Sequence, residues 1–175
     1  MQLAKIVSSS GELTKEQRKA LKLAFPSGPI TSDAKDDDTF GTKEPRAPGA
    51  SWDISRDAAV RDLERHGAMT SRDLVKGRTT LVAVKDDRGE PCLEIAARFK
   101  AKLTGASNGP KNAKIEGGVV NAEALTLTPV DAKKGPHRVM NRVGTEIVAT
   151  IDVKGKPMTL NLETLSVTES TYEWR

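Results

Sequence analysis

The sequence contains few of the residues from which most catalytic, metal and disulfide sites are built. Among its 175 residues there are one cysteine, two histidines and 3% aromatic residues. The single Cys92 excludes an intramolecular disulfide, and the chain has no N-x-[ST] acceptor site for N-linked glycosylation. Motifs for phosphate-binding loops, dinucleotide binding, serine nucleophile elbows and HExxH zinc sites are absent as well. We therefore expect a protein that is not an enzyme and that has no catalytic residues, cofactor or metal.

The chemically active side chains that remain are interpreted as structural. Cys92 would need a positioned base and a lowered pKa to act as a nucleophile, and the sequence shows neither. It has the outward parity of its strand if Leu93 points inward, and we interpret it as a small apolar strand residue. A zinc site would have to combine Cys92 with His66 and His137 from distant regions. The acidic run at 33–38 lacks the glycine and distal glutamate of a calcium-binding loop and is interpreted as a solvated linker.

Long apolar runs are also missing. No stretch approaches the roughly 18 residues that a membrane-spanning helix needs, and the polar start MQLAKIVSSS does not have the apolar core of a signal peptide. We expect a protein without a membrane partner that is cytoplasmic, or made in a cytoplasm and incorporated into a particle. A content of 37% hydrophobic and 30% charged residues is typical of a globular domain.

The positive charge is concentrated in the middle of the chain. The net charge is +4, but residues 76–142 alone hold 13 Lys/Arg against 7 Asp/Glu. A local basic field of this kind attracts phosphate backbones or acidic protein surfaces, although a solvated surface that keeps the protein soluble explains it too.

The N-terminal part of the sequence predicts two helices separated by a long irregular stretch. The first helix has Thr14 as its cap and is stopped by Pro26, and the second runs from Ser55 to Gly67. The stretch at 27–53 has no apolar periodicity and contains several prolines. Irregular segments of this length are usually functional or disordered, so we predict an extended arm that packs on the protein's own body or on a neighbouring subunit.

From residue 79 onward the apolar residues alternate with polar ones, which is typical of half-buried strands. The segments at 92–104 and 146–167 show this pattern, and the first has a hairpin partner joined to it by the turn DDRG. We predict an α+β fold. Residues 1–78 contain the two helices and the arm, and residues 79–175 form a five- or six-stranded antiparallel β barrel or sandwich.

Residues 63–77, LERHGAMTSRDLVKG, resemble the opening of a helix-turn-helix. In that motif a recognition helix follows and enters the major groove. Here the strand-like RTTLVAVK follows instead. We therefore interpret the segment as a capped helix end and a short helical turn.

Two sets of residues are candidates for binding. The first set consists of apolar and aromatic residues of the arm and the C-terminus that could anchor a partner protein: Ile30, Phe40, Trp52, Tyr172 and Trp174. The second set consists of basic residues on one strand face and in nearby loops: Arg98, Lys100, Lys102, Lys111, Lys114, Lys133, Lys134, Arg138 and Arg142. Because no aromatic platform faces outward with them, their contact with a nucleic acid would be electrostatic and weakly sequence-specific.

The first functional hypothesis is a non-enzymatic assembly or accessory protein that binds neighbouring subunits, its own copies or others, through the arm and the terminal aromatics. A virion accessory subunit, such as a head-decoration or connector-like protein, fits this hypothesis. The alternative is a basic nucleic-acid-binding or regulatory protein, including an inhibitor of a nucleic-acid-handling machine. An enzyme without a recognisable motif is the third reading.

Overall fold

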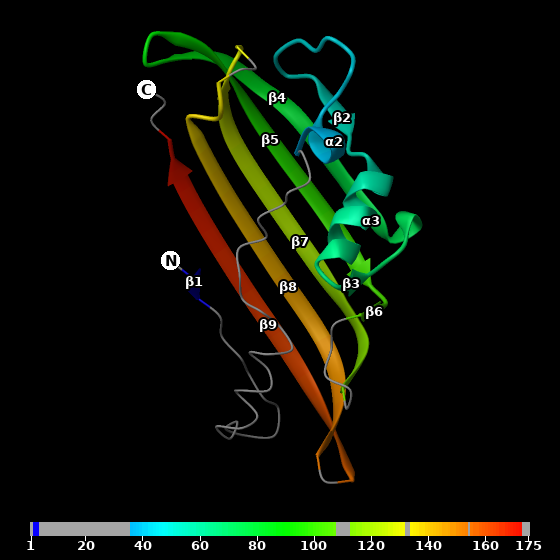
Figure 1. Cartoon of the computed structure of the whole chain (residues 1–175). Helices are drawn as coiled ribbons and strands as arrows, with labels where there is room; N and C mark the ends of the chain where they lie inside the picture. Colours follow the sequence, from blue (N-terminus) through cyan, green and yellow to red (C-terminus); the bar gives the residue numbers. More distant parts are fainter. Residues whose placement is uncertain (1, 4–35, 108–112, 132–133, 154, 173–175) are drawn as a thin grey trace.

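The computed structural model describes residues 2–3, 36–107, 113–131, 134–153 and 155–172. Its main feature is one antiparallel sheet with the strand order β1-β9-β8-β7-β5-β4-β2 (Figure 1). Most of the sheet is formed by five long strands: β4 (Val75–Asp87), β5 (Glu90–Leu103), β7 (Ala113–Pro129), β8 (Arg138–Val153) and β9 (Lys156–Thr171). Its two outermost strands are short: β1 (Gln2–Leu3) and β2 (Ser51–Asp53).

The other elements are small and lie near β4 and β5 (Figure 1). They are α2 (Asp36–Phe40), α3 (Arg56–Arg65), the 3-10 helix η1 (Arg72–Leu74), and the two-stranded sheet of β3 (Ala68–Met69) and β6 (Gly105–Ala106). Within the described ranges, no helix has the length and apolar character that crossing a membrane requires. The short helical turn at η1 and the strand that follows it confirm our interpretation of the helix-turn-helix resemblance.

Within the described residues the sheet is open, so the predicted closed barrel or sandwich is not confirmed. Among the described strands the order has two different ends, β1 and β2, which do not pair with each other. The reason is physical: alternation along a strand shows that one face is buried, but it does not show what covers that face. Here α3 covers part of it, through Ala59 and Leu63, which pack with Val75 of β4 and Ala101 of β5.

Of the two predicted helices, one lies within the described residues. The second one is α3, in which Ser55 is the N-cap and accepts a hydrogen bond from the backbone N–H of Ala58. The first one, between Thr14 and Pro26, lies outside the described residues, so the pair is not confirmed. The described part of the predicted arm, 36–53, is also not extended throughout, because it contains α2 and β2.

The predicted alternation in β5 is confirmed from Ala97 to Leu103, whereas residues 93–96 are all partly buried. Ala97, Ala101 and Leu103 are buried in the inward-facing set. The opposite face carries the exposed cations Arg98, Lys100 and Lys102. A second buried cluster continues the inward face across the later strands through Leu103, Val120, Ile147, Ala149, Leu160 and Leu162.

The β4–β5 hairpin is fixed by a tight turn and by one irregularity. Arg88 and Gly89 have φ values of 56° and 79°, as a two-residue turn of the type favoured in hairpins requires. Asp87 therefore stands opposite Glu90. Between Leu81 and Ala83 the register shifts by one residue. The outward side chains of β4 therefore have even numbers before the shift, as in Lys76 and Arg78, and odd numbers after it, as in Asp87.

Gly77 of β4 lies where the chain before α3 approaches the sheet most closely. A Cβ atom at this position would stand 2.6 Å from Ile54 Cδ1, 2.7 Å from Phe99 Cβ and 2.6 Å from the Arg98 carbonyl oxygen. Ile54 is buried, and its backbone N–H donates a hydrogen bond to the Gly77 carbonyl at 3.3 Å. The absence of a side chain at 77 is therefore what allows the segment that leads into α3 to pack on β4 and β5.

Replacing Gly77 by alanine should lower the free energy of unfolding by about 1–3 kcal/mol, since overpacked sites in a close-packed core typically cost this much. Urea unfolding of the variant and the wild type measures the change. Gly144→Ala in β8 is the matched control, because a Cβ there meets nothing nearer than the Thr164 carbonyl at 4.0 Å. Equal stability of Gly77→Ala and the wild type would contradict this account of the packing.

Candidate functional site

Five cations lie together on the outward face of β4 and β5. Lys76 stands opposite Lys100, and Arg78 stands opposite Arg98. Residues directly opposite each other in an antiparallel pair share a face, with Cβ atoms about 4.5–5.5 Å apart. Lys102 continues the row on β5, and all five side chains are exposed. We call Lys76, Arg78, Arg98, Lys100 and Lys102 the cationic patch.

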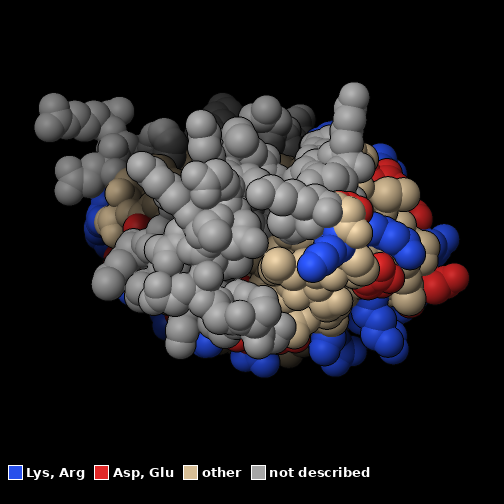
Figure 2. Space-filling model, turned by 90° about the horizontal axis from the view of Figure 1, so that it is seen from below, with Lys and Arg blue, Asp and Glu red and all other residues tan. Residues whose placement is uncertain are grey.

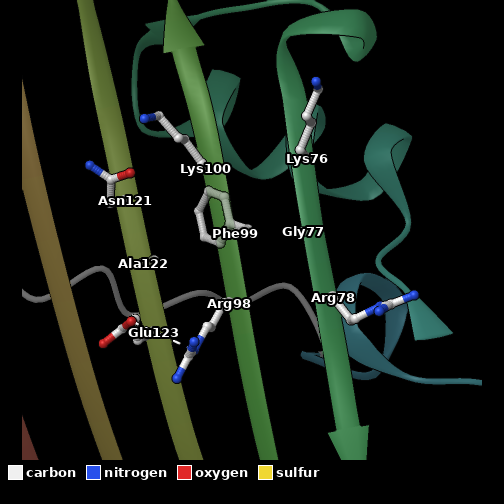
Figure 3. Close-up of a pocket in the computed structure, with 9 residues that line it drawn as sticks. All are labelled: Lys76, Gly77, Arg78, Arg98, Phe99, Lys100, Asn121, Ala122 and Glu123. Atoms are coloured by element: carbon white, nitrogen blue, oxygen red, sulfur yellow. Dashed lines mark ion pairs between the residues drawn. The ribbon is translucent and has the colours of Figure 1, made fainter. Parts of the chain in front are cut away.

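Within the described ranges, few of the positive charges of the cationic patch are paired with a carboxylate. Glu123 of β7 forms an ion pair with Arg98 at 3.6 Å (Figure 3). Within the described ranges no ion pair involves Lys76, Arg78 or Lys100. Like charges directly opposite each other destabilise a strand pair, by about 0.2–1 kcal/mol per pair. The two like-charge pairs therefore weaken the sheet that carries them, and the stability of the fold does not explain their presence.

The surface between these side chains is hollowed. A shallow depression of about 470 Å³ is lined by Lys76, Gly77, Arg78, Arg98, Phe99, Lys100, Asn121, Ala122 and Glu123 (Figure 3). Lysine and arginine side chains also project along the lower margin of the molecule in the end-on view (Figure 2). The depression is open to solvent along the strands, so an extended ligand fits it better than an enclosed small molecule does.

The other predicted basic residues do not join the cationic patch. Three of them form ion pairs: Lys114 with Glu116 at 3.6 Å, Arg138 with Glu169 at 2.5 Å, and Lys134 with Glu90. Arg142 of β8 stands opposite Glu123, two strands away from the β5 cations. Lys111 and Lys133 lie outside the described residues. Sequence reasoning missed Lys76 and Arg78, because only the shifted register of β4 places them beside Arg98 and Lys100.

The aromatic residues of the arm make contacts within the chain. The ring of Phe40 lies 6.2 Å from that of Phe99, centroid to centroid. The indole N–H of Trp52 donates a hydrogen bond to the Phe40 carbonyl at 2.8 Å, and the guanidinium of Arg46 lies 5.9 Å from the centre of the Trp52 ring. These contacts connect α2 and β2 with each other and with the sheet, so both rings are engaged within the protein.

The remaining predicted anchors are only partly described. Tyr172 follows β9, its side chain is 40% exposed, and its backbone N–H donates to the His137 carbonyl at 2.9 Å. The Arg88 side chain donates to the Tyr172 carbonyl at 3.0 Å. Ile30 and Trp174 lie outside the described residues.

A second group of polar side chains gathers at the hairpin end of the sheet. His137 precedes β8, and its backbone N–H donates to the carbonyl of Leu127 in β7 at 2.8 Å, which holds it beside β7. Its Nδ1 lies 2.7 Å from Asp87 Oδ2 and 3.7 Å from Cys92 Sγ, and its Nε2 lies 3.8 Å from Glu90 Oε2. Cys92 is completely buried and His137 is 6% exposed. We call Asp87, Glu90, Cys92 and His137 the Cys92 cluster.

The Cys92 cluster does not have the geometry of an activated nucleophile. Burial raises the pKa of the Cys92 thiol, and the negative charges of Asp87, Glu90 and Asp86 raise it further. In a catalytic relay the histidine faces the nucleophile with one ring nitrogen and the carboxylate with the other. Here Nδ1 of His137 faces both Asp87 and Cys92. Cys92 is buried, as we expected of a small apolar residue, but its polar neighbours were not predicted.

Comparison with protein-family models, with curated proteins and with solved structures finds no match for this chain.

Replacing Lys100 by glutamine should raise the free energy of unfolding at low ionic strength by about 0.2–1 kcal/mol, because it removes one like-charge pair. The gain should disappear near 1 M salt, where the Debye length is about 3 Å. Urea unfolding at the two salt concentrations measures both effects. Lys85→Gln is the control, since Lys85 lies on the same two strands and forms an ion pair with Glu94 at 2.8 Å. A loss of stability in Lys100→Gln as large as that in Lys85→Gln would refute the repulsion.

Proposed function

We propose that this protein is a non-enzymatic binding protein whose cationic patch holds the phosphate backbone of a single-stranded nucleic acid. The observation that carries the proposal is the presence of two like-charge pairs at directly opposite strand positions, Lys76 with Lys100 and Arg78 with Arg98. A polyanion that lies across both pairs converts their mutual repulsion into attraction, and it releases counterions as it binds. The bound state thereby recovers the stability that the free sheet loses.

The form of the surface favours a single strand. Sheet faces carry single-stranded RNA in common RNA-binding modules, whereas duplex DNA is usually read by an element that enters a groove. Such modules stack bases on outward-facing aromatic rings. Phe99 belongs to the inward-facing set and packs against Phe40. We therefore expect binding to the backbone with weak preference for sequence.

The test is binding of a labelled single-stranded oligonucleotide as a function of salt concentration. For a single strand, the slope of log K against log salt changes by about 0.7 for each phosphate that the protein no longer neutralises. The triple variant Lys76→Gln, Arg98→Gln, Lys100→Gln should therefore reduce the slope by about 2. The matched control is Lys85→Gln, Lys114→Gln, Arg138→Gln, which removes the same charge from three ion-paired positions.

Three outcomes would count against nucleic-acid binding. The first is the absence of binding at low salt, and the second is an equal reduction of affinity in the two triple variants, which would indicate an effect of net charge. The third is equally tight binding of poly-L-glutamate, which would assign the cationic patch to acidic protein surfaces.

Assembly with further protein subunits is the second candidate function, and β8 and β9 favour it. Met140, Leu165 and Val167 are 38%, 41% and 42% exposed on the same sheet face as the cationic patch. One edge of β9 pairs with β8. Along the other edge, within the described ranges, Leu165 and Ser166 are the residues that pair with another strand, which is β1. A long strand edge beside exposed apolar side chains is suited to pairing with another chain. Self-association into a particle component, such as a virion accessory subunit, would use this side of the molecule.

Light scattering after size-exclusion chromatography tests this second candidate. The wild type should form a multimer, and Leu165→Lys with Val167→Lys should shift it to a monomer, because two buried cations would oppose the contact. Val84→Lys is the control, since Val84 is 51% exposed on β4. A monomeric wild type at high concentration, or dissociation by Val84→Lys as well, would rule out self-association through β8 and β9.

A further inference from the structure

The Cys92 cluster brings together the single cysteine of the chain and one of its two histidines. They come from different segments: Asp87 ends β4, Cys92 lies near the start of β5, and His137 precedes β8. The hairpin turn places Asp87 on the same face as Cys92, and a hydrogen bond from the Val130 N–H to the Pro91 carbonyl at 2.9 Å holds the β7–β8 connection over them. Figure 1 shows this connection close to the β4–β5 turn.

Three ligand atoms of the cluster converge. One oxygen of Asp87, Sγ of Cys92 and Nδ1 of His137 all lie within 4.8 Å of one another. In a tetrahedral zinc site, with Zn–S near 2.3 Å and Zn–N near 2.0 Å, sulfur and nitrogen are about 3.5 Å apart. The separation of Sγ and Nδ1 is 3.7 Å. The 2.7 Å between Nδ1 and Asp87 Oδ2 is a hydrogen-bond distance, which would widen to about 3.3 Å when a metal replaces the shared proton.

The surroundings of the cluster resemble the outer shell of a metal site. Glu90 Oε2 lies 3.8 Å from Nε2 of His137, on the side of the ring away from Asp87 and Cys92. Carboxylates on this side of the ring orient the histidines that bind metals when they accept the N–H of the second ring nitrogen. Lys134 pairs with Glu90 and fixes the carboxylate in turn. The side chain of Asp87 is 33% exposed, so an ion could reach the buried sulfur and nitrogen past it.

We propose that Asp87, Cys92 and His137 form a binding site for a borderline-soft divalent cation of the Zn²⁺ class. A thiolate, an imidazole and a carboxylate are the ligand types that Zn²⁺ accepts, and three protein ligands leave a fourth position for water. The cation would offset the negative charge that Asp87, Glu90 and Cys92 gather around one imidazole. Its binding would also join the β4–β5 turn to the β7–β8 connection and so stabilise this end of the sheet.

The test uses the full chain after treatment with a chelator, titrated with Co²⁺ and then with Zn²⁺. One Co²⁺ per chain should produce a thiolate-to-cobalt charge-transfer absorption, and Zn²⁺ should displace it. Cys92→Ser should abolish the absorption. Asp87→Asn keeps the shape of a partly exposed side chain and should weaken Co²⁺ binding at least about tenfold, while Glu90→Gln should weaken it about 10- to 100-fold.

His66→Gln is the matched control, because His66 is the other histidine and lies exposed at the end of α3, with Nδ1 2.8 Å from the Asp62 carbonyl. It should leave affinity and absorption unchanged. A second readout is the melting temperature, which Zn²⁺ should raise in the wild type and in His66→Gln, and raise less in Asp87→Asn at the same Zn²⁺ concentration. The proposal is overturned if the wild type takes up no stoichiometric Co²⁺, if the absorption persists in Cys92→Ser, or if His66→Gln reduces binding as much as Asp87→Asn does.

Discussion

The register of the β4–β5 hairpin is the constraint on which both the cationic patch and the Cys92 cluster depend. The two-residue turn at Arg88 and Gly89 aligns the strand ends and so places Asp87 on the face of Cys92. The shift between Leu81 and Ala83 then reverses the parity of β4. Without that shift, the first half of β4 would direct its cations to the opposite face from those of β5. One extra residue in one strand therefore creates the cationic patch.

The outward face of the sheet combines three surfaces of different chemistry. The hairpin end holds the Cys92 cluster, the middle of β4 and β5 holds the cationic patch, and β8 and β9 expose apolar side chains. Along β5, Cys92 and Lys100 point to the same side, eight residues apart, or about 26 Å at the rise of an extended strand. The three surfaces therefore lie on one face without competing for the same space, and each can be altered by mutation separately.

The inward face shows how a chain with few aromatic residues builds a core. Small and branched side chains such as Ala101 and Val120 fill it, and the ring of Phe99 joins its two buried clusters. Phe40 and Trp52 contribute to packing and hydrogen bonding around α2. Their roles explain why an aromatic residue in an irregular stretch does not by itself indicate an anchor for a partner: such a ring packs against the nearest apolar surface available, including the protein's own.

The sequence by itself determined the antiparallel strands, the turn at Arg88 and Gly89, the inward and outward sets in the second half of β5 and the helix that begins after Ser55. These features follow from local rules: side-chain alternation, turn chemistry and capping act over a few residues. Whether the sheet closes, where β4 slips by one residue and which loop covers Cys92 were decided only by the tertiary structure. They depend on contacts between residues far apart in the chain, such as the hydrogen bond from the His137 N–H to the Leu127 carbonyl and the packing of Ile54 over Gly77. No local pattern encodes these contacts, because each requires both partners to be in place first.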